Sequence, residues 1–315
     1  MKKIIYMAAL AMTFIACSNE DDIVYTNKDI KIQTTIGTMT KTTVDAQGAA
    51  KFVKGDEFSF YAWDGTFAAD NTPWISNVKI MLDTDGKTWM PEKQILWKTA
   101  ETKHDFLGIY PASLITETTD LAKVEYTMSS GDNTTAYDDI LRAYSPEVVM
   151  PESNTLTLPF KHVMAKLRVN LKFRNQWDEA PEVSSVAPQI VYKADINFYT
   201  GEVKPSTNSN YYGRVMKRMQ TPANDYVYSY EVIAVPDDEG FVKIEIQIPN
   251  GSVTDNDTYT FINDETISLI SGKVTTVNLI VGRNKVELVT PAEGEEGGIT
   301  IDDWTDNTTY DGDAL

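Results

Sequence analysis

The sequence predicts an all-β protein that consists of two tandem β-sandwich domains. Its 315 residues are too many for one ordinary core and suit two domains of common size. Thr, Val, Ile and Tyr recur in alternating runs that Gly, Asn and Asp interrupt, and no segment after residue 20 keeps a helical period. Short alternating segments bounded by turn residues are typical of sandwiches.

The stretch from Thr155 to Phe173 indicates where the first domain ends and the second begins. Its apolar residues up to Phe160 fall on even positions, and those from Val163 onward fall on odd positions. One regular strand cannot change this parity, because successive side chains point to opposite faces of the sheet. We therefore expect a bulge, a bend or a change of sheet here. The predicted domains are an N-terminal sandwich over residues 30–160 and a C-terminal sandwich with a terminal strand over residues 161–315.

The strands of the first domain follow from alternating apolar residues and the turns between them. Asp85 and Gly86 form a preferred two-residue hairpin turn, and Pro111 ends a strand because proline has no amide hydrogen to donate. The predicted strand segments are residues 29–37, 51–63, 78–82 with 87–89, 95–97, 105–111, 138–143 and 155–160.

The second domain shows the same alternation, with Gly and Pro at its joints. Its last strand follows a glycine-rich acidic stretch, residues 293–298, that we expect to be a flexible spacer. The predicted strand segments are residues 163–173, 190–198, 226–235, 242–248, 259–262, 273–281, 286–289 and 299–304.

The N-terminus has the features of a lipoprotein signal peptide over residues 1–16. A basic start precedes an apolar stretch that is too short to span a bilayer. Cys17, the only cysteine, follows directly, and this junction resembles a bacterial lipobox in which Phe14 replaces the usual leucine. The resemblance implies that Cys17 is acylated and anchors the chain to outer-membrane lipid. The alternative is an ordinary signal peptide with an incidental cysteine.

An acidic tether is predicted over residues 17–29. Within it, the run from Ser18 to Asp22 resembles the surface-export signal of some Gram-negative lipoproteins, and the alternative is a solvated linker. The formal net charge of −18 repels phosphate backbones, so we expect no nucleic-acid partner.

The sequence predicts no enzyme, no metal site and no cofactor. The two histidines, His104 and His162, lie in no metal-binding motif, and we expect His162 to be a structural hydrogen-bonding residue. The run from Asp83 to Gly86 begins like a calcium loop, but Gln94 stands where the closing glutamate belongs. We therefore predict a hairpin turn there. The 46 acidic residues make chance carboxylate pairs inevitable, so the sequence does not test glycoside hydrolysis.

The aromatic residues leave glycan binding open as a second function. The six tryptophans are candidates for a sugar-stacking platform, although Trp89 and Trp97 lie in strand-like contexts that favour the core. The polar, aromatic segment from Ser209 to Arg214 is either a ligand contact or simply a long loop.

Six motifs together resemble the fimbrillin family, the subunits of type V pili, and in particular its fimbrillin-like lipoproteins. They occur in order and cover nearly the whole chain after the signal: Lys51-Phe-x-x-Gly-Asp56, Phe106-x-x-Ile-Tyr-Pro111, Asp139-Ile-Leu141, Leu158-x-Phe-x-His-x-Met-Ala-Lys-Leu-x-Val169, Gly272-Lys-Val-Thr-Thr-Val-Asn-Leu279 and Ile301-Asp-Asp-Trp304. The resemblance implies two transthyretin-like or immunoglobulin-like sandwiches and export as a lipoprotein.

The resemblance also implies a mechanism of assembly by strand exchange. A surface protease removes the first strand of a stalk subunit, and a donor strand from the next subunit fills the groove. The displaced strand would carry Ile30, Ile32 and Ile36, and the candidate donor strand carries Ile299, Ile301 and Trp304. The family's Thr-Arg cleavage site corresponds here to Thr40-Lys41, so the cut would fall between Lys41 and Thr42.

No arginine occurs between Cys17 and Arg142, so an arginine-specific protease has no target in the connector after the first strand. Three roles follow: a stalk subunit processed at lysine, an uncut anchor, or a tip. The expected function is therefore a non-enzymatic surface lipoprotein in a pilus, with other pilus subunits as partners and a host protein or glycan as the adhesion target. The alternative is a glycan-binding lipoprotein of a polysaccharide-uptake system.

Overall fold

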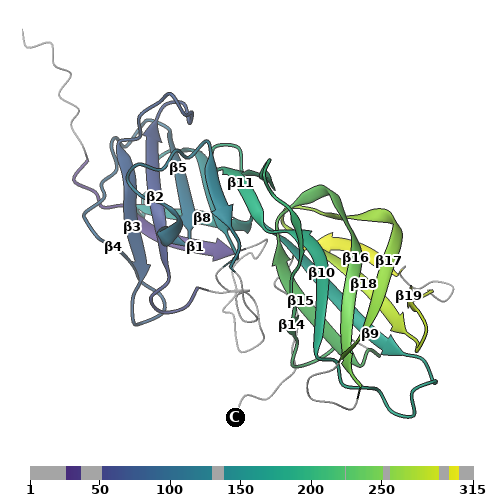
Figure 1. Cartoon of the computed structure of the whole chain (residues 1–315). Helices are drawn as coiled ribbons and strands as arrows, with labels where there is room; N and C mark the ends of the chain where they lie inside the picture. The colour runs from purple at the N-terminus through teal and green to yellow at the C-terminus, as the bar shows by residue number, and fades with distance from the viewer. Residues whose placement is uncertain are drawn as a thin grey trace, which may run out of the picture.

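The computed structural model describes residues 26–36, 52–129, 138–223, 225–250, 256–290 and 298–304, and it confirms the all-β class. The described strands form two sandwich-like bodies, with β11 at the side of the first body that faces the second (Figure 1). The one helical element among these residues is a single 3₁₀ turn, η1 (Ala112–Leu114).

The first body is organised around a seven-stranded sheet in the order β1-β8-β7-β5-β2-β3-β4. Its interior strand β2 is buried at every position except its two ends, because a core lies on each face. We call these the inner core, which contains Phe58 and Phe60 together with Trp97 and Phe160, and the outer core, which contains Tyr61 and Trp63 together with Ile196 and Trp304. The strands are β1 (Lys31–Ile36), β2 (Glu57–Asp64), β3 (Ile75–Leu82), β4 (Trp89–Pro91), β5 (His104–Tyr110), β7 (Leu141–Val148) and β8 (Thr155–His162).

A three-stranded sheet in the order β12-β11-β6 contributes to the outer core. It consists of β6 (Val124–Thr127), β11 (Lys193–Asn197) and β12 (Glu202–Pro205). Val124 and Ile196 lie opposite each other on paired strands and pack in the same cluster as Trp63.

The second body is a sandwich of a four-stranded sheet, β13-β10-β16-β17, and a sheet in the order β14-β15-β9-β18-β19, with β20 also paired to β18. Alternate residues of β9, including Leu167 and Val169, lie in the same core as Ile244 and Ile246 of β16. The strands are β9 (Ala165–Phe173), β10 (Ser185–Val191), β13 (Tyr211–Gly213), β14 (Lys217–Arg218), β15 (Tyr228–Ala234), β16 (Asp237–Pro249), β17 (Asn256–Leu269), β18 (Lys273–Val281), β19 (Val286–Leu288) and β20 (Ile299–Asp303).

The change of sheet predicted from the apolar parity is present. β8 ends at His162 in the first sheet, and β9 begins at Ala165 in a sheet of the second body. The chain later returns, because β11 pairs with β6 of the first body and β12 pairs with β11, although both strands follow β9 in sequence. The division of the domains at residue 160 stays a prediction.

Two predicted strands differ in detail. Residues 95–97 form only an isolated bridge, between Leu96 and Asp29, because the backbone partner of this segment is the short N-terminal stretch before β1. The segment 190–198 is split at Tyr192 into β10 and β11, which belong to different sheets. The predicted hairpin is confirmed: β3 and β4 pair antiparallel, and Gly86 adopts a φ of 64° that favours glycine.

Candidate functional site: the groove that holds β1

β1 is an edge strand that pairs in parallel with β8 over all six of its residues, from Lys31 opposite Thr155 to Ile36 opposite Phe160. The backbone just before it is held on its other side by residues 95–97. The Ile30 amide donates to the Ile95 carbonyl at 3.0 Å, and the Trp97 amide donates to the Lys28 carbonyl at 3.0 Å. Residues 26–30 are therefore held by residues 95–97 and residues 31–36 by β8, so this segment is tied to two separate parts of the chain.

The three isoleucines of the predicted displaced strand contact one core. Ile30 is 4% exposed and belongs to the inner core of the first body, and Ile32 and Ile36 are partly buried against the same core. This arrangement follows from alternation, since residues two apart on a strand share a face. The groove is thus lined by apolar side chains of the seven-stranded sheet.

Side-chain hydrogen bonds add to the backbone pairing of this segment. The indole Nε1 of Trp89 donates to the Thr34 hydroxyl at 3.1 Å, and the Gln94 amide donates to the Asp29 carboxylate at 2.8 Å. Gln94 is the residue that departs from a calcium loop, and it holds the N-terminal segment instead. Asp85 accepts hydrogen bonds from Thr88 and Lys87, which lower the pKa of its carboxyl group. Hydrogen bonds of this kind, in which an aspartate accepts from backbone amides two and three residues later, are typical of the predicted hairpin turn.

The candidate donor strand lies in the second body, paired antiparallel with the first half of β18. Ile299 lies opposite Val277 and is partly buried, whereas Ile301 is 42% exposed. Trp304 directly follows the strand and is only 6% exposed. In this structure the candidate donor strand therefore does not contact the core that holds Ile30, Ile32 and Ile36: Ile299 packs in the core of the second body and Trp304 in the outer core.

Trp304 is held between two basic side chains at the place where β8 passes into β9. Its ring stacks on His162, with centroids 3.8 Å apart and planes 4° apart, and the Lys166 ammonium lies 4.2 Å from the ring centroid. The Trp304 amide donates to the Gly272 carbonyl at 3.0 Å. The Nδ1 atom of His162 is 2.7 Å from Asp139, which confirms the hydrogen-bonding role expected of this histidine.

Residues of the six sequence motifs meet at two points in space. Asp139, His162, Gly272 and Trp304 come from four different motifs and converge at this junction. Residues of the first two motifs meet elsewhere, where the Tyr110 hydroxyl donates to Asp56 at 3.1 Å. Sequence spacing carries no sign of these contacts, because the partners are far apart along the chain.

The structure does not favour a platform of tryptophans. Trp63, Trp89, Trp97 and Trp304 are buried, and Trp74 and Trp177 are partly buried. Exposed aromatic rings occur instead on β13, where Tyr211 is 47% and Tyr212 is 52% exposed. These two residues belong to the aromatic segment that the sequence marked as a ligand contact or a loop.

His104 is buried beside Trp74 and Trp97, and burial lowers the pKa of its imidazole. The folded state therefore favours the neutral ring. As the pH falls below the ordinary value of 6.5, protons bind preferentially to the unfolded chain. The stability present above that pH is expected to decline below it.

Urea unfolding at pH 7.5 and pH 5.0 measures this decline. His104→Phe, which removes the titrating group and keeps a ring in the core, should lose less stability over this interval than the wild-type chain. An identical loss in both proteins would assign the pH dependence to other groups.

No group of three or more metal-ligating side chains occurs in the described parts of the chain. Over the same residues, no helix is both long and apolar enough to cross a membrane. Cys17, Lys41 and Thr42 lie outside the described residues, so their predicted lipidation and processing stay predictions.

Comparison with known proteins places these features in a family. A candidate cell adhesion protein of Bacteroides ovatus is 18% identical, with a TM-score of 0.62 over 89% of this chain and 98% of that one. A candidate cell adhesion protein of Bacteroides uniformis is 14% identical, with a TM-score of 0.60 over 84% of this chain and 100% of that one. At these identities the similarity is one of fold. A search of curated proteins gave no match. The sequence model described as fimbrillin-like matches residues 39–304, and the chain therefore belongs to the fimbrillin-like family.

Proposed function

We propose that this protein is a non-enzymatic pilus subunit at the cell surface that contributes to adhesion. It would be exported as a lipoprotein, held in the outer membrane through acylated Cys17, and assembled with other subunits by exchange of its first strand. Membership of the fimbrillin-like family and the fold shared with candidate cell adhesion proteins support the pilus role. The observation that carries the mechanism is the pairing of β1 with β8 as an edge strand, with Ile30, Ile32 and Ile36 packed against the apolar core.

The energetics of this groove suit the exchange of one strand for another. Removing residues 26–36 takes the buried Ile30 and the partly buried Ile32 and Ile36 out of the core; burying an isoleucine fully is worth about 1.5–3 kcal/mol. The same step leaves the β8 edge without its partner over six residues. Open backbone groups beside an apolar groove are the two features that an incoming strand satisfies.

The segment from Ile299 to Trp304 is the proposed donor. Its glycine-rich spacer, residues 293–298, would let it reach a neighbouring subunit. To act as a donor it has to leave β18 and to withdraw Trp304 from between His162 and Lys166. A subunit whose first strand is not cut would serve as an anchor, so the lysine-processed stalk subunit, the uncut anchor and the tip remain alternatives.

N-terminal sequencing of surface-associated material tests the processing step. We expect a new terminus at Thr42 in assembled material, because the only cationic residue of the connector close to the family's cleavage position is Lys41. Lys41→Gln should remove this terminus together with the multimers.

Lys54→Gln, at an exposed position beyond the connector, serves as the control and should assemble normally. An intact acylated Cys17 terminus in assembled pili would contradict the cut and assign the chain to an anchor.

Binding of a surface glycan is the second candidate, and the exposed tyrosines of β13 favour it. Tyr212 packs edge-to-face on Tyr192 with centroids 4.9 Å apart, and the Tyr211 hydroxyl donates to Asp237 at 3.1 Å. Both rings are thus held in place while they stay accessible to a sugar. Two results together would favour this function over the pilus role: the chain binds a glycan and loses this binding in Tyr212→Ala, and the chain forms no multimers.

A further inference from the structure

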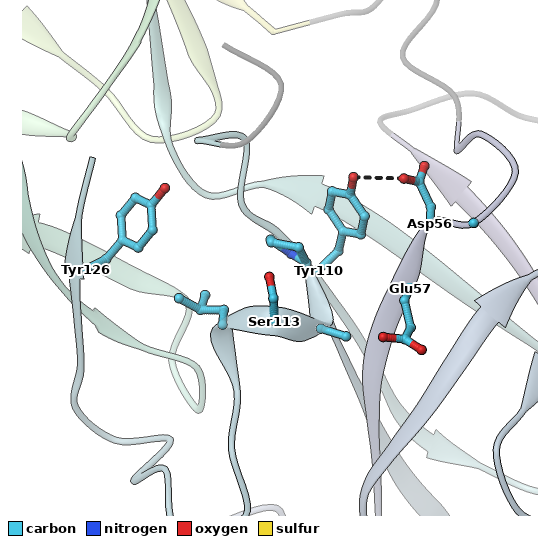
Figure 2. A pocket seen from close by; sticks show the side chains of 9 residues that line it. Asp56, Glu57, Tyr110, Ser113 and Tyr126 are labelled. Atoms are coloured by element: carbon cyan, nitrogen blue, oxygen red, sulfur yellow. Dashed lines mark hydrogen bonds between the residues drawn. The ribbon is translucent and has the colours of Figure 1, made fainter. Parts of the chain in front are cut away.

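A pocket of about 400 Å³ opens at one end of the seven-stranded sheet. It lies between the start of β2, the end of β5, the turn η1 and Tyr126 of β6. Figure 2 shows the Tyr110 hydroxyl pointing at Asp56 on its border. This volume falls in the range of ligand pockets. The assembly mechanism proposed above makes no use of the pocket.

Two carboxylates line the pocket, those of Asp56 and Glu57, and Asp56 also accepts from the Val53 amide at 2.6 Å. The hydroxyl protons of both tyrosines are already committed: Tyr110 donates to Asp56 at 3.1 Å, and Tyr126 donates to Asp138 at 2.6 Å. The carboxylate of Glu57 is exposed and adds a negative charge to the wall, and Ser113 contributes a hydroxyl that can donate or accept. A ligand that donates hydrogen bonds and carries positive charge would match these groups.

Lys79 bonds to the lining residue Ala112, and its ammonium group is fully engaged. Lys79 donates to the Ser59 hydroxyl at 2.8 Å, to the Ala112 carbonyl at 2.7 Å and to the Ile115 carbonyl at 3.0 Å. All three donor positions of its ammonium group are therefore used beneath η1. Lys79 weakens the field of Glu57 and occupies the Ala112 carbonyl, but it is not bonded to the carboxylate of Asp56 or of Glu57 in these contacts.

An exposed apolar strip continues from the pocket along the sheet. Glu57, Met81 and Met90 lie opposite one another on β2, β3 and β4, and therefore share a face. Met81 is 45% and Met90 is 50% exposed. Unbranched thioether side chains adapt their shape to a partner, so the pair forms a soft apolar surface beside the charged pocket.

We propose that this pocket receives a lysine or arginine side chain from an extended segment of a partner protein, and that an apolar residue next to it in that segment packs on Met81 and Met90. Charge complementarity supports this occupant, since the chain has a net charge of −18 and the pocket is bordered by two carboxylates. The apolar strip favours a peptide segment over a free amine, because a free amine leaves the methionines uncovered.

The test uses the full mature chain labelled with ¹³C at the methionine methyl groups. The probes are the acetylated and amidated tripeptides Leu-Lys-Leu and Leu-Arg-Leu, with Leu-Gln-Leu as the uncharged control. The signals of Met81 and Met90, assigned with Met81→Leu and Met90→Leu, should shift saturably with the two cationic peptides only.

Variants of Glu57 test whether peptide binding depends on its charge or only on non-specific apolar contact. Glu57→Gln should weaken binding about 2- to 5-fold, which is the range for one partly solvated ion pair, and Glu57→Lys should abolish it. Glu152→Gln is the matched control, because Glu152 is exposed and lies away from the pocket. It follows the end of β7 that pairs with His104, whereas the pocket is at the Tyr110 end of β5. Thermal unfolding of each variant confirms that it is folded.

Three results would overturn the proposal. Equal shifts with Leu-Gln-Leu would show that the peptides bind only through apolar contact with the methionines and that the pocket does not recognise the positive charge. Shifts with a neutral oligosaccharide such as maltoheptaose, but not with the peptides, would make the pocket a sugar site. An absence of shifts at millimolar peptide would leave the pocket without this ligand. Because the experiment uses unassembled chain, its result is independent of strand exchange.

Discussion

Replacing Trp97 by alanine should lower the free energy of unfolding by about 3–5 kcal/mol, the usual cost of removing a buried tryptophan. Trp97 is fully buried in the inner core, where its ring packs edge-to-face on Phe106 with centroids 5.3 Å apart. Its backbone also holds the segment before β1, since its amide donates to Lys28 and its carbonyl accepts from the Thr26 amide. The variant should therefore loosen the groove as well as the core.

Urea unfolding measures the stability change, and hydrogen exchange of residues 26–36 measures the loosening. Trp97→Phe keeps most of the buried ring and should lose much less. A loss below about 1 kcal/mol in Trp97→Ala would show that the groove does not depend on this side chain, since that is far less than the cost of truncating a buried tryptophan.

Trp304→Ala should also lower the free energy of unfolding by about 3–5 kcal/mol, because Trp304 is buried in the outer core between His162 and Lys166. The effect should centre on β20, which has only β18 as a strand partner among the described residues. Amides of the β18 half from Lys273 to Val277 should exchange faster, since that half pairs with β20 on one side.

Trp304→Phe is the control that separates packing from hydrogen bonding. Within the described part of the chain the indole Nε1 of Trp304 has no hydrogen-bond partner, so phenylalanine loses ring area but no hydrogen bond. We expect it to retain most of the stability. Unchanged exchange of β18 in Trp304→Ala would mean that the strand is held by its backbone pairing alone.

The sequence was sufficient for the fold class and for most strands, because these depend on local alternation of apolar side chains. The parity of residues 155–173 located the passage from β8 to β9, and Asp85-Gly86 located the β3–β4 hairpin. The same reasoning predicted a strand at residues 95–97, where Ile95 and Trp97 are buried but the backbone makes only one bridge. Burial follows from local pattern, whereas strand pairing also needs a partner.

For the candidate site, the sequence supplied the residues and the structure supplied their neighbours. Alternation was enough to predict that Ile30, Ile32 and Ile36 share a face, but not that they contact the inner core beside β8. Trp304 was identified as the end of a terminal strand, whereas its stacking on His162 required the fold.

The sequence by itself determined what each segment of this protein buries: the alternating residues settle the strand faces, and the family motifs supply a likeness to fimbrillins. Only the tertiary structure decided which segments meet. It returns β11 and β12 to the first body, pairs residues 26–30 with residues 95–97 and residues 31–36 with β8, and joins Asp56 to Tyr110. The physical reason is that side-chain burial is encoded by neighbours along the chain, while backbone pairing between distant strands is selected by the packing of the whole molecule.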